Sequence, residues 1–313
     1  MSEIELNDSI LTRTDPRANA YMYYLLDVFH KVSGKFDIRY WAECGTVLGY
    51  KRHGGIIPWD DDIDVDIHPD DLSKLCSVEV EEEFFNYGCS LDPIYFGYRV
   101  CPISLPTFGT SVKNNTTKGV EYHWPFLDVF ATAFFDKTGS GVRDHIRYKD
   151  QDALKWWPDY YLTQEELQIE LVDFGPSDMR IKIFVPGKIE DYLLRIYGDD
   201  YMSVAYQELD HANNRPIEKV ICKLIDREPG QVICDEVLIR GLCEPIRVSA
   251  SSVDTNECDD SRILKHTQAL IQIAVGGDAT TMQLNGATES RRGVADRQAI
   301  ERGENEGMII GQA

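Results

Sequence analysis

The sequence lacks the patterns that mark several common classes of protein. None of its eight cysteines forms a C-x-x-C pair, so neither a zinc knuckle nor a redox motif is indicated. No apolar run approaches the length needed to cross a bilayer, which predicts that there is no transmembrane segment. The first residues are acidic and lack the basic-then-apolar pattern of a secretory leader. We therefore expect a cytoplasmic protein with reduced thiols.

Positive charge is also scarce, and the last third of the chain has no aromatic residue. The sequence carries 32 Lys and Arg against 53 Asp and Glu, a formal net charge of −21, which argues against nucleic acid and anionic membranes as general partners. No Phe, Tyr or Trp follows Tyr206, and such a segment has little with which to build a dense core. We therefore predict a polar lead-in at 1–14, a folded domain at 15–235 and a loose tail at 236–313.

The central feature of the sequence is an acidic run between Pro58 and Ile67. Its five carboxylates fall in seven positions, where like charges repel and raise one another's pKa values unless cations are bound. From Asp62 onward, acids alternate strictly with β-branched residues, which predicts a strand with a buried apolar face and a row of acids opposite. Oxygen ligands arranged in this way suit Mg²⁺ or Mn²⁺.

Two other interpretations of the run are weaker. Acidic runs are most often solvated surfaces or disordered tails, but the apolar residues at 56–59 are not typical of either. A calcium loop of the EF-hand type needs Gly at its sixth position, where the chain has Val65. The acids that would occupy ligand positions of such a loop are Asp60, Asp62, Asp64 and Asp71.

The surrounding segments predict a domain of mixed helices and strands. A helix is expected from about residue 15 to residue 34, because an acid precedes a proline at its start. A strand at 38–42 leads into a turn of small residues at 43–49, whose amides could approach a phosphate. A basic cluster at 51–53 follows, ahead of the acidic strand.

The later segments alternate between the two kinds of element. One strand at 96–103 contains Arg99, and another at 124–130 contains Asp128. A bare carboxylate is costly to bury, so Asp128 is expected to have a partner. The other expected elements are a helix at 69–88, helical structure at 142–171 with a break at 157–158, a strand at 180–185 and a helix at 188–197.

Taken in order, these elements resemble the nucleotidyltransferase fold, in which a Gly-Ser/Thr turn precedes an Asp-x-Asp strand. The stretches 40–49, 52–64 and 124–130 are similar to the defining blocks of the LicD family of phosphocholine transferases and their fukutin-related, ribitol-phosphate-transferring relatives. A weaker likeness covers 186–198. The chain departs from the family at Cys44, where many members carry Gly, and at Asp66, which is usually small or apolar.

The resemblance implies an α+β fold with a nucleotidyltransferase-like mixed sheet flanked by helices. It implies that Asp62, Asp64 and Asp128 are both the catalytic residues and the ligands of Mg²⁺ or Mn²⁺. Arg52 is a candidate because a guanidinium binds phosphate in bidentate fashion, although solvated surface charge is the simpler interpretation of such a cluster. His53 could instead be a buried, hydrogen-bonded ring. The full set of candidate nucleotide contacts is Gly45, Thr46, Arg52, His53 and Arg99.

The implied reaction moves a phospho-alcohol group from a CDP-linked donor to a hydroxyl of a sugar or glycan, and it releases a nucleoside monophosphate. The candidate site residues do not indicate whether the donor is CDP-choline, CDP-ribitol or another CDP-alcohol. Two alternatives stay open: a nucleotidyltransferase that moves a nucleoside monophosphate onto a small molecule, and an inactive metal-binding or scaffolding homologue. The sequence does not define an oligomeric state.

Overall fold

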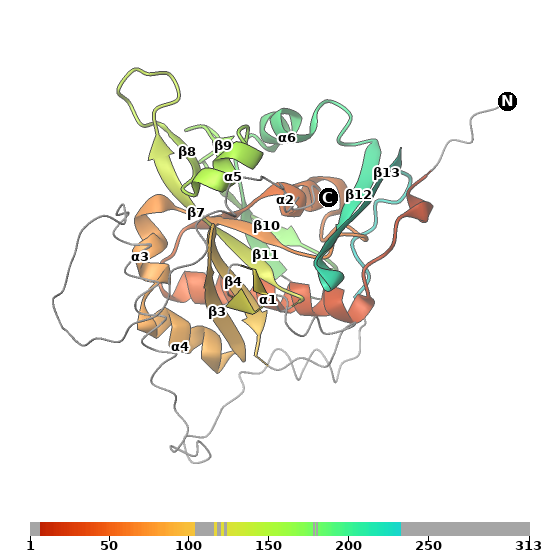
Figure 1. Ribbon diagram of the computed structural model, residues 1–313, viewed down its shortest axis with the longest axis horizontal. Coiled ribbons are helices and arrows are strands. Elements are labelled where there is room, and N and C mark those ends of the chain that lie inside the picture. The colour runs from red at the N-terminus through yellow and green to blue at the C-terminus, as the bar shows by residue number, and fades with distance from the viewer. Residues whose placement is uncertain are drawn as a thin grey trace, which may run out of the picture.

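The acidic run ends in an interior strand of a seven-stranded mixed sheet (Figure 1). The order along the sheet is β1-β2-β7-β4-β3, and β8 and β9 extend it from β7. The strands are β1 (Tyr40–Ala42), β2 (Asp64–Ile67), β3 (Cys89–Ile94), β4 (Gly97–Pro102), β7 (Leu127–Phe135), β8 (His145–Tyr148) and β9 (Tyr161–Leu162). The computed structural model describes residues 7–232 except 104–115, 118–119, 122–123, 178 and 180. The predicted tail at 236–313 lies outside the described residues.

Strand direction decides which residues meet at the centre of this sheet. The pair β2 and β7 is parallel, whereas the other pairs of the sheet are antiparallel. Asp64 on β2 is therefore in register with Asp128 on β7, and Arg99 on β4 is in register with Asp128 from the other side. The expected mixed sheet flanked by helices is confirmed.

Helices lie on both sides of the sheet, with α1 and α4 below it and α2 and α6 above it in Figure 1. The helices are α1 (Pro16–Lys35), α2 (Cys44–His53), α3 (Leu72–Leu75), α4 (Val78–Asn86), α5 (Gln151–Trp156) and α6 (Ile189–Tyr197). Short 3-10 turns are η1 (Asp8–Ile10), η2 (Pro69–Asp71) and η3 (His211–Asn213). Two-stranded sheets pair β5 (Thr116–Thr117) with β6 (Val120–Glu121), β10 (Glu170–Phe174) with β11 (Ile181–Val185), and β12 (Val204–Asp210) with β13 (Arg215–Lys223).

The first helix forms where the sequence predicts it. The Asp15 carboxylate accepts the backbone N–H of Arg17 and caps α1, which satisfies one of the free donors at the helix start. The apolar stripe of α1 is buried, and the Phe29 ring meets Tyr40 edge-on with centroids 5.0 Å apart. This packing places α1 against the β1 end of the sheet and forms the main core.

The structure corrects the prediction of a turn at 43–49. These residues begin helix α2, in which Val47 and Leu48 are buried against the core. The basic cluster at 51–53 is the last turn of the same helix, and Gly54 ends the helix in the left-handed conformation (φ 72°). The many small residues suggested a loop, but they allow the helix to lie close to β2.

The helical prediction for 142–171 is wrong outside α5. That segment forms β8, β9 and the start of β10, because aromatic side chains along it pack against β7. The Tyr148 ring packs against Phe130 in a tilted arrangement with ring centroids 4.9 Å apart, and tertiary packing of this kind overrides local propensity. The helix expected at 69–88 is broken at Ser77, whose hydroxyl caps α4. The sequence analysis missed β3 and the hairpin of β12 and β13, whereas the strand at 180–185 and helix α6 are confirmed.

One glycine brings two strands close enough to build the site. A Cβ on Gly97 would lie 2.0 Å from the Val129 carbonyl oxygen, so only glycine allows β4 to approach β7 at this point. Arg99 follows two residues later on the same strand and faces Asp128 across the ladder.

Candidate active site

The structure places the three predicted metal ligands on or next to the two parallel strands β2 and β7. Asp64 is the first residue of β2, Asp62 precedes that strand, and Asp128 is the second residue of β7. All three are buried, with 5%, 6% and 1% of Asp62, Asp64 and Asp128 exposed. The strand expected from Asp62 begins only at Asp64, and the row of acids faces the protein interior rather than bulk water.

Burial and mutual repulsion raise the pKa values of these acids. Burial raises the pKa of Asp62 to about 6, although the nearby His211 opposes the shift. Burial raises the pKa of Asp64 well above its usual range, and Asp62 and Asp128 add to the effect. The Oδ1 atom of Asp64 is buried and has no hydrogen-bond partner among the described residues. A buried carboxylate oxygen without a partner is costly, which favours a cation at this position.

Asp128 is held by a guanidinium. The Nε and Nη2 atoms of Arg99 donate to its two oxygens at 2.6 and 2.7 Å, which is the bidentate geometry expected for a strong ion pair. The guanidinium carbon of Arg99 lies 3.6 Å from the centroid of the Phe126 ring. Asp128 thus has the partner that its buried position requires. A carboxylate has about four lone-pair sites, so this pairing leaves Asp128 able to bind a cation.

A histidine that the sequence analysis missed completes the cluster. His211 begins η3 and its backbone N–H donates to Asp61 Oδ2 at 2.8 Å. Its ring Nδ1 lies 2.6 Å from Asp61 Oδ1, and its Nε2 lies 3.2 Å from Asp62 Oδ2. One ligand atom from each of Asp61, Asp62 and His211 can be chosen so that all lie within 4.8 Å of one another, so the cluster fits a divalent metal ion.

The electrostatics of His211 follow from this placement. Burial alone would lower its pKa, but the carboxylates of Asp62 and Asp61 raise it to about 10. His211 follows the acidic run by 150 residues, and no known motif has this spacing. The sequence shows only that an acid precedes the histidine, which does not indicate a role at the site.

Thr46 and Gly45 lie in the first turn of α2 beside the acids. The Thr46 hydroxyl accepts the backbone N–H of Asp64 at 2.9 Å, which fixes the start of β2 to the helix. The backbone N–H of Cys44 has no acceptor within the helix, because it lies at the helix start. It donates instead to the Tyr192 hydroxyl at 3.1 Å. Cys44 has φ 46°, in the left-handed region that favours glycine, at the position where the chain departs from the family pattern.

The other predicted nucleotide contacts, Arg52 and His53, lie at the far end of α2. Arg52 Nη1 donates to the carbonyls of Tyr201 and Val204 at 3.0 and 2.9 Å, and its Nε donates to His53 Nε2 at 3.1 Å. His53 is 4% exposed, and its Nδ1 donates to the Glu228 carbonyl at 3.1 Å. Burial and the neighbouring Arg52 lower the pKa of His53 to about 4. A role for either residue at a nucleotide stays a prediction.

Asp66 belongs to a second buried acid pair behind the site. Trp41 Nε1 donates to Asp66 Oδ2 at 2.9 Å, and the Tyr148 hydroxyl donates to Glu43. Burial raises the pKa of Asp66 to about 7, although hydrogen bonds with Glu43 and Trp41 oppose the shift. Asp66 is therefore neither solvent-exposed nor in the same cluster as Asp61 and Asp62.

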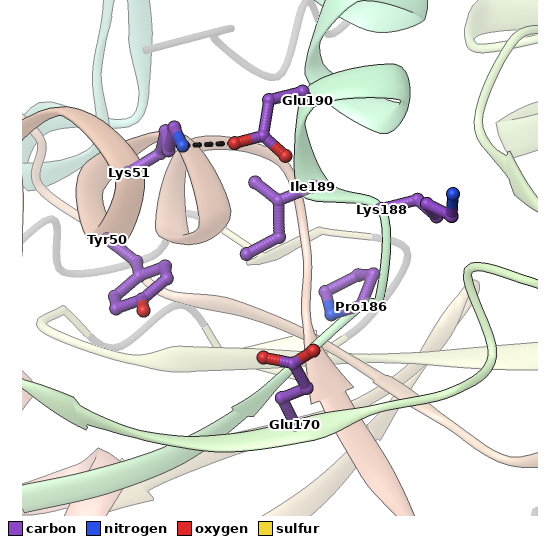
Figure 2. A pocket seen from close by; sticks show the side chains of 7 residues that line it. All are labelled: Tyr50, Lys51, Glu170, Pro186, Lys188, Ile189 and Glu190. Atoms are coloured by element: carbon purple, nitrogen blue, oxygen red, sulfur yellow. Dashed lines mark hydrogen bonds and ion pairs between the residues drawn. The ribbon is translucent and has the colours of Figure 1, made fainter.

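A cavity of about 440 Å³ opens between α2 and α6 (Figure 2). In Figure 2, Lys51 from α2 and Glu190 from α6, which both line the cavity, form an ion pair. The residues that line it are Tyr50, Lys51, Glu170, Pro186, Lys188, Ile189 and Glu190, and none of them belongs to the acidic cluster.

Residues 37–166 match the family model described as the LicD/FKTN/FKRP nucleotidyltransferase domain. The matched segment contains β2, β4 and β7, and therefore Asp62, Asp64, Arg99 and Asp128. This match over residues 37–166 confirms the resemblance to the LicD family that the sequence indicates. His211 lies outside the matched segment.

Several proteins share the sequence over shorter stretches. The lipopolysaccharide cholinephosphotransferase LicD of Haemophilus influenzae is 41% identical over 64 residues, which are 20% of this chain and 24% of that protein. The human ribitol 5-phosphate transferase FKRP is 54% identical over 37 residues, 12% of this chain and 8% of its own. An uncharacterized protein of Rickettsia prowazekii is 39% identical over 74 residues, which are 24% of this chain and 28% of that protein. The matches thus span less than a third of each of these relatives.

Among the described residues, no helix has the length and apolar character that a membrane span requires.

Proposed function

We propose that the protein is a divalent-metal-dependent transferase that moves a phospho-alcohol group from a CDP-linked donor to a hydroxyl of a sugar or glycan. The observation that carries the proposal is that buried Asp62, Asp64 and Asp128 lie on or next to the parallel strands β2 and β7, within the segment that matches the family model. The named relatives transfer choline phosphate or ribitol phosphate, which supports a phospho-alcohol as the transferred group.

The side chains fit a divalent ion. Asp64 offers a buried oxygen without a partner, and Asp62 lies in a cluster whose ligand atoms are within 4.8 Å of one another. When bound, Mg²⁺ or Mn²⁺ would neutralise charge on the pyrophosphate of the donor and make an acceptor hydroxyl more acidic. In the absence of a cation, burial and repulsion between the acids disfavour the charged forms of Asp62 and Asp64, and their pKa values are therefore raised.

The protein groups supply position and charge. Arg99 fixes both oxygens of Asp128, so this carboxylate is oriented before any substrate arrives. Asp128 is then the candidate general base for the acceptor hydroxyl, because it is held at the centre of the sheet beside Asp64. The first turn of α2, with Gly45 and Thr46, brings the positive end of a helix dipole to the same place, where phosphate charge is favourable.

Product analysis tests the proposal. The full chain is incubated with Mg²⁺ or Mn²⁺ and either CDP-choline, CDP-ribitol or CTP, in the presence of sugar or glycan acceptors. Release of CMP from a CDP-alcohol, with the phospho-alcohol on the acceptor, is the expected result. Release of pyrophosphate from CTP would instead identify a nucleotidyltransferase, and no metal uptake or turnover would indicate an inactive homologue.

A further inference from the structure

His211 is fixed by two contacts with a single carboxylate. Asp61 accepts from its backbone N–H at 2.8 Å and lies 2.6 Å from its Nδ1. The Phe126 ring packs edge-on against the imidazole with centroids 5.5 Å apart, and the residue is 7% exposed. Because Asp61 can only accept while ionised, Nδ1 carries a proton. The ring orientation is therefore set, and Nε2 points at Asp62.

This arrangement has the form of a metal-bound histidine with its orienting carboxylate. Histidines that bind metals commonly donate their other ring N–H to a carboxylate, which fixes the tautomer and leaves the second nitrogen for the ion. Asp61 accepts from both the backbone and the ring of His211, so it is suited to orient the imidazole. His211 Nε2 lies 3.2 Å from Asp62 Oδ2, so a metal ion bound at Nε2 would replace the proton that the ring shares with Asp62 in the metal-free protein.

A second observation concerns Asp64, which lies two residues from Asp62 at the start of β2. Asp64 is 6% exposed, and its buried Oδ1 has no hydrogen-bond partner among the described residues. Asp62 contributes to the raised pKa of Asp64, so the two carboxylates are neighbours, and Asp62 is the acid that faces His211. The site thus combines a nitrogen donor with carboxylate oxygens.

The geometry points to His211 Nε2 as a ligand of the metal ion, oriented by Asp61, in a mixed nitrogen and oxygen site that binds Mn²⁺ in preference to Mg²⁺. Imidazole binds transition-metal ions well, whereas Mg²⁺ prefers oxygen ligands and retains its water. This inference deepens the proposed function, since it concerns the metal of the same site. It also assigns a role to the hairpin of β12 and β13, which lies outside the matched family segment and brings His211 to the acids.

Pulsed electron paramagnetic resonance of bound Mn²⁺ tests the assignment, because it detects a directly coordinated imidazole nitrogen. The wild-type full chain, loaded with Mn²⁺ and no nucleotide, should give nitrogen modulation, and His211→Gln should lose it. His145→Gln is the matched control, since His145 also pairs with a carboxylate, Asp144, at 2.6 Å. Absence of the modulation in the wild type, its persistence in His211→Gln, or failure of the wild type to bind Mn²⁺ would overturn the assignment.

Affinity measurements separate ligation from a structural role. Calorimetry should give a greater loss of affinity for Mn²⁺ than for Mg²⁺ in His211→Gln, and equal losses would contradict the inference. Should His211→Gln fail to fold, Asp61→Asn serves as the second variant. It should keep the nitrogen modulation and bind Mn²⁺ about 10–100-fold more weakly, the usual cost of losing an orienting carboxylate; unchanged affinity would count against the role of Asp61. None of these measurements requires turnover, so they stand even if every CDP-alcohol proves inert.

Discussion

Arg99 and Asp128 form a bidentate ion pair across adjacent strands at the centre of the sheet. Their side chains are 13% and 2% exposed. On its other side, Asp128 is in register with Asp64, so one carboxylate lies between a guanidinium and a second acid. The arrangement keeps Asp128 oriented in the absence of metal and makes Arg99 a structural counterion of the site.

Replacing Arg99 by Met should destabilise the metal-free protein by about 3–5 kcal/mol, because it leaves Asp128 buried without its partner. Urea unfolding measures the loss. Adding Mn²⁺ should recover part of it, since a cation replaces the missing positive charge. The double variant Arg99→Met with Asp128→Leu serves as the control and should recover stability without metal. An Arg99→Met protein as stable as the wild type would contradict this account of the pair.

The buried acids predict the pH dependence of the metal-free protein. The pKa values of Asp62 and Asp66 are raised to about 6 and about 7 in the folded state, so folding favours their protonated forms. Their contribution to the free energy of unfolding is present at about pH 4 and is lost as the pH rises to about 7. His211 acts in the same direction at higher pH, since its pKa is raised to about 10 and its contribution is lost between about pH 6.5 and 10.

Urea unfolding after treatment with a chelator, measured from pH 5 to pH 8, should therefore show stability falling as the pH rises. Asp66→Asn should flatten the slope, because it removes one of the buried acids whose pKa is raised. Mn²⁺ should reverse the trend, since the ion binds the deprotonated carboxylates. Stability that increases from pH 5 to pH 7 in the metal-free protein would be inconsistent with the raised pKa values.

Thr46 links the acidic strand to helix α2 through a single hydrogen bond to the N–H of Asp64. Thr46→Val should cost about 1–3 kcal/mol of unfolding free energy, because the buried N–H loses its acceptor. Thr46→Ser retains the hydroxyl and is the matched control. Both variants are compared by urea unfolding, and equal stability of the two would show that the bond is unimportant.

The sequence predicted the acidic strand and Asp128 because their chemistry is local. A row of acids alternating with β-branched residues has few structural explanations, and a lone acid in an apolar strand requires a partner. Arg99 was a candidate phosphate contact, and that role stays a prediction. Its pairing with Asp128 could not be predicted, because the register between β4 and β7 cannot be inferred from composition.

The remaining parts of the site depend on tertiary structure. His211 is brought to Asp61 by a hairpin whose strands were not predicted, and no spacing rule connects the two residues. Arg52 was a candidate phosphate contact and His53 could instead have been a buried ring; helix α2 continues to His53 and buries both residues against backbone carbonyls. The segment 43–49 was expected to be a turn because its small residues are typical of loops as well as of closely packed helices.

The central claim is that Asp62 and Asp64 hold the divalent ion on which transfer depends. Its most direct test is the release of CMP from the CDP-alcohol that the wild type consumes, measured at saturating Mg²⁺ or Mn²⁺ for the double variant Asp62→Asn with Asp64→Asn. Asp70→Asn, a change at an exposed acid after β2, is the control. The account predicts at least about a hundredfold loss of turnover in the double variant, on the scale of removing one electrostatic stabiliser, and wild-type turnover in Asp70→Asn. Full turnover by the double variant would contradict it.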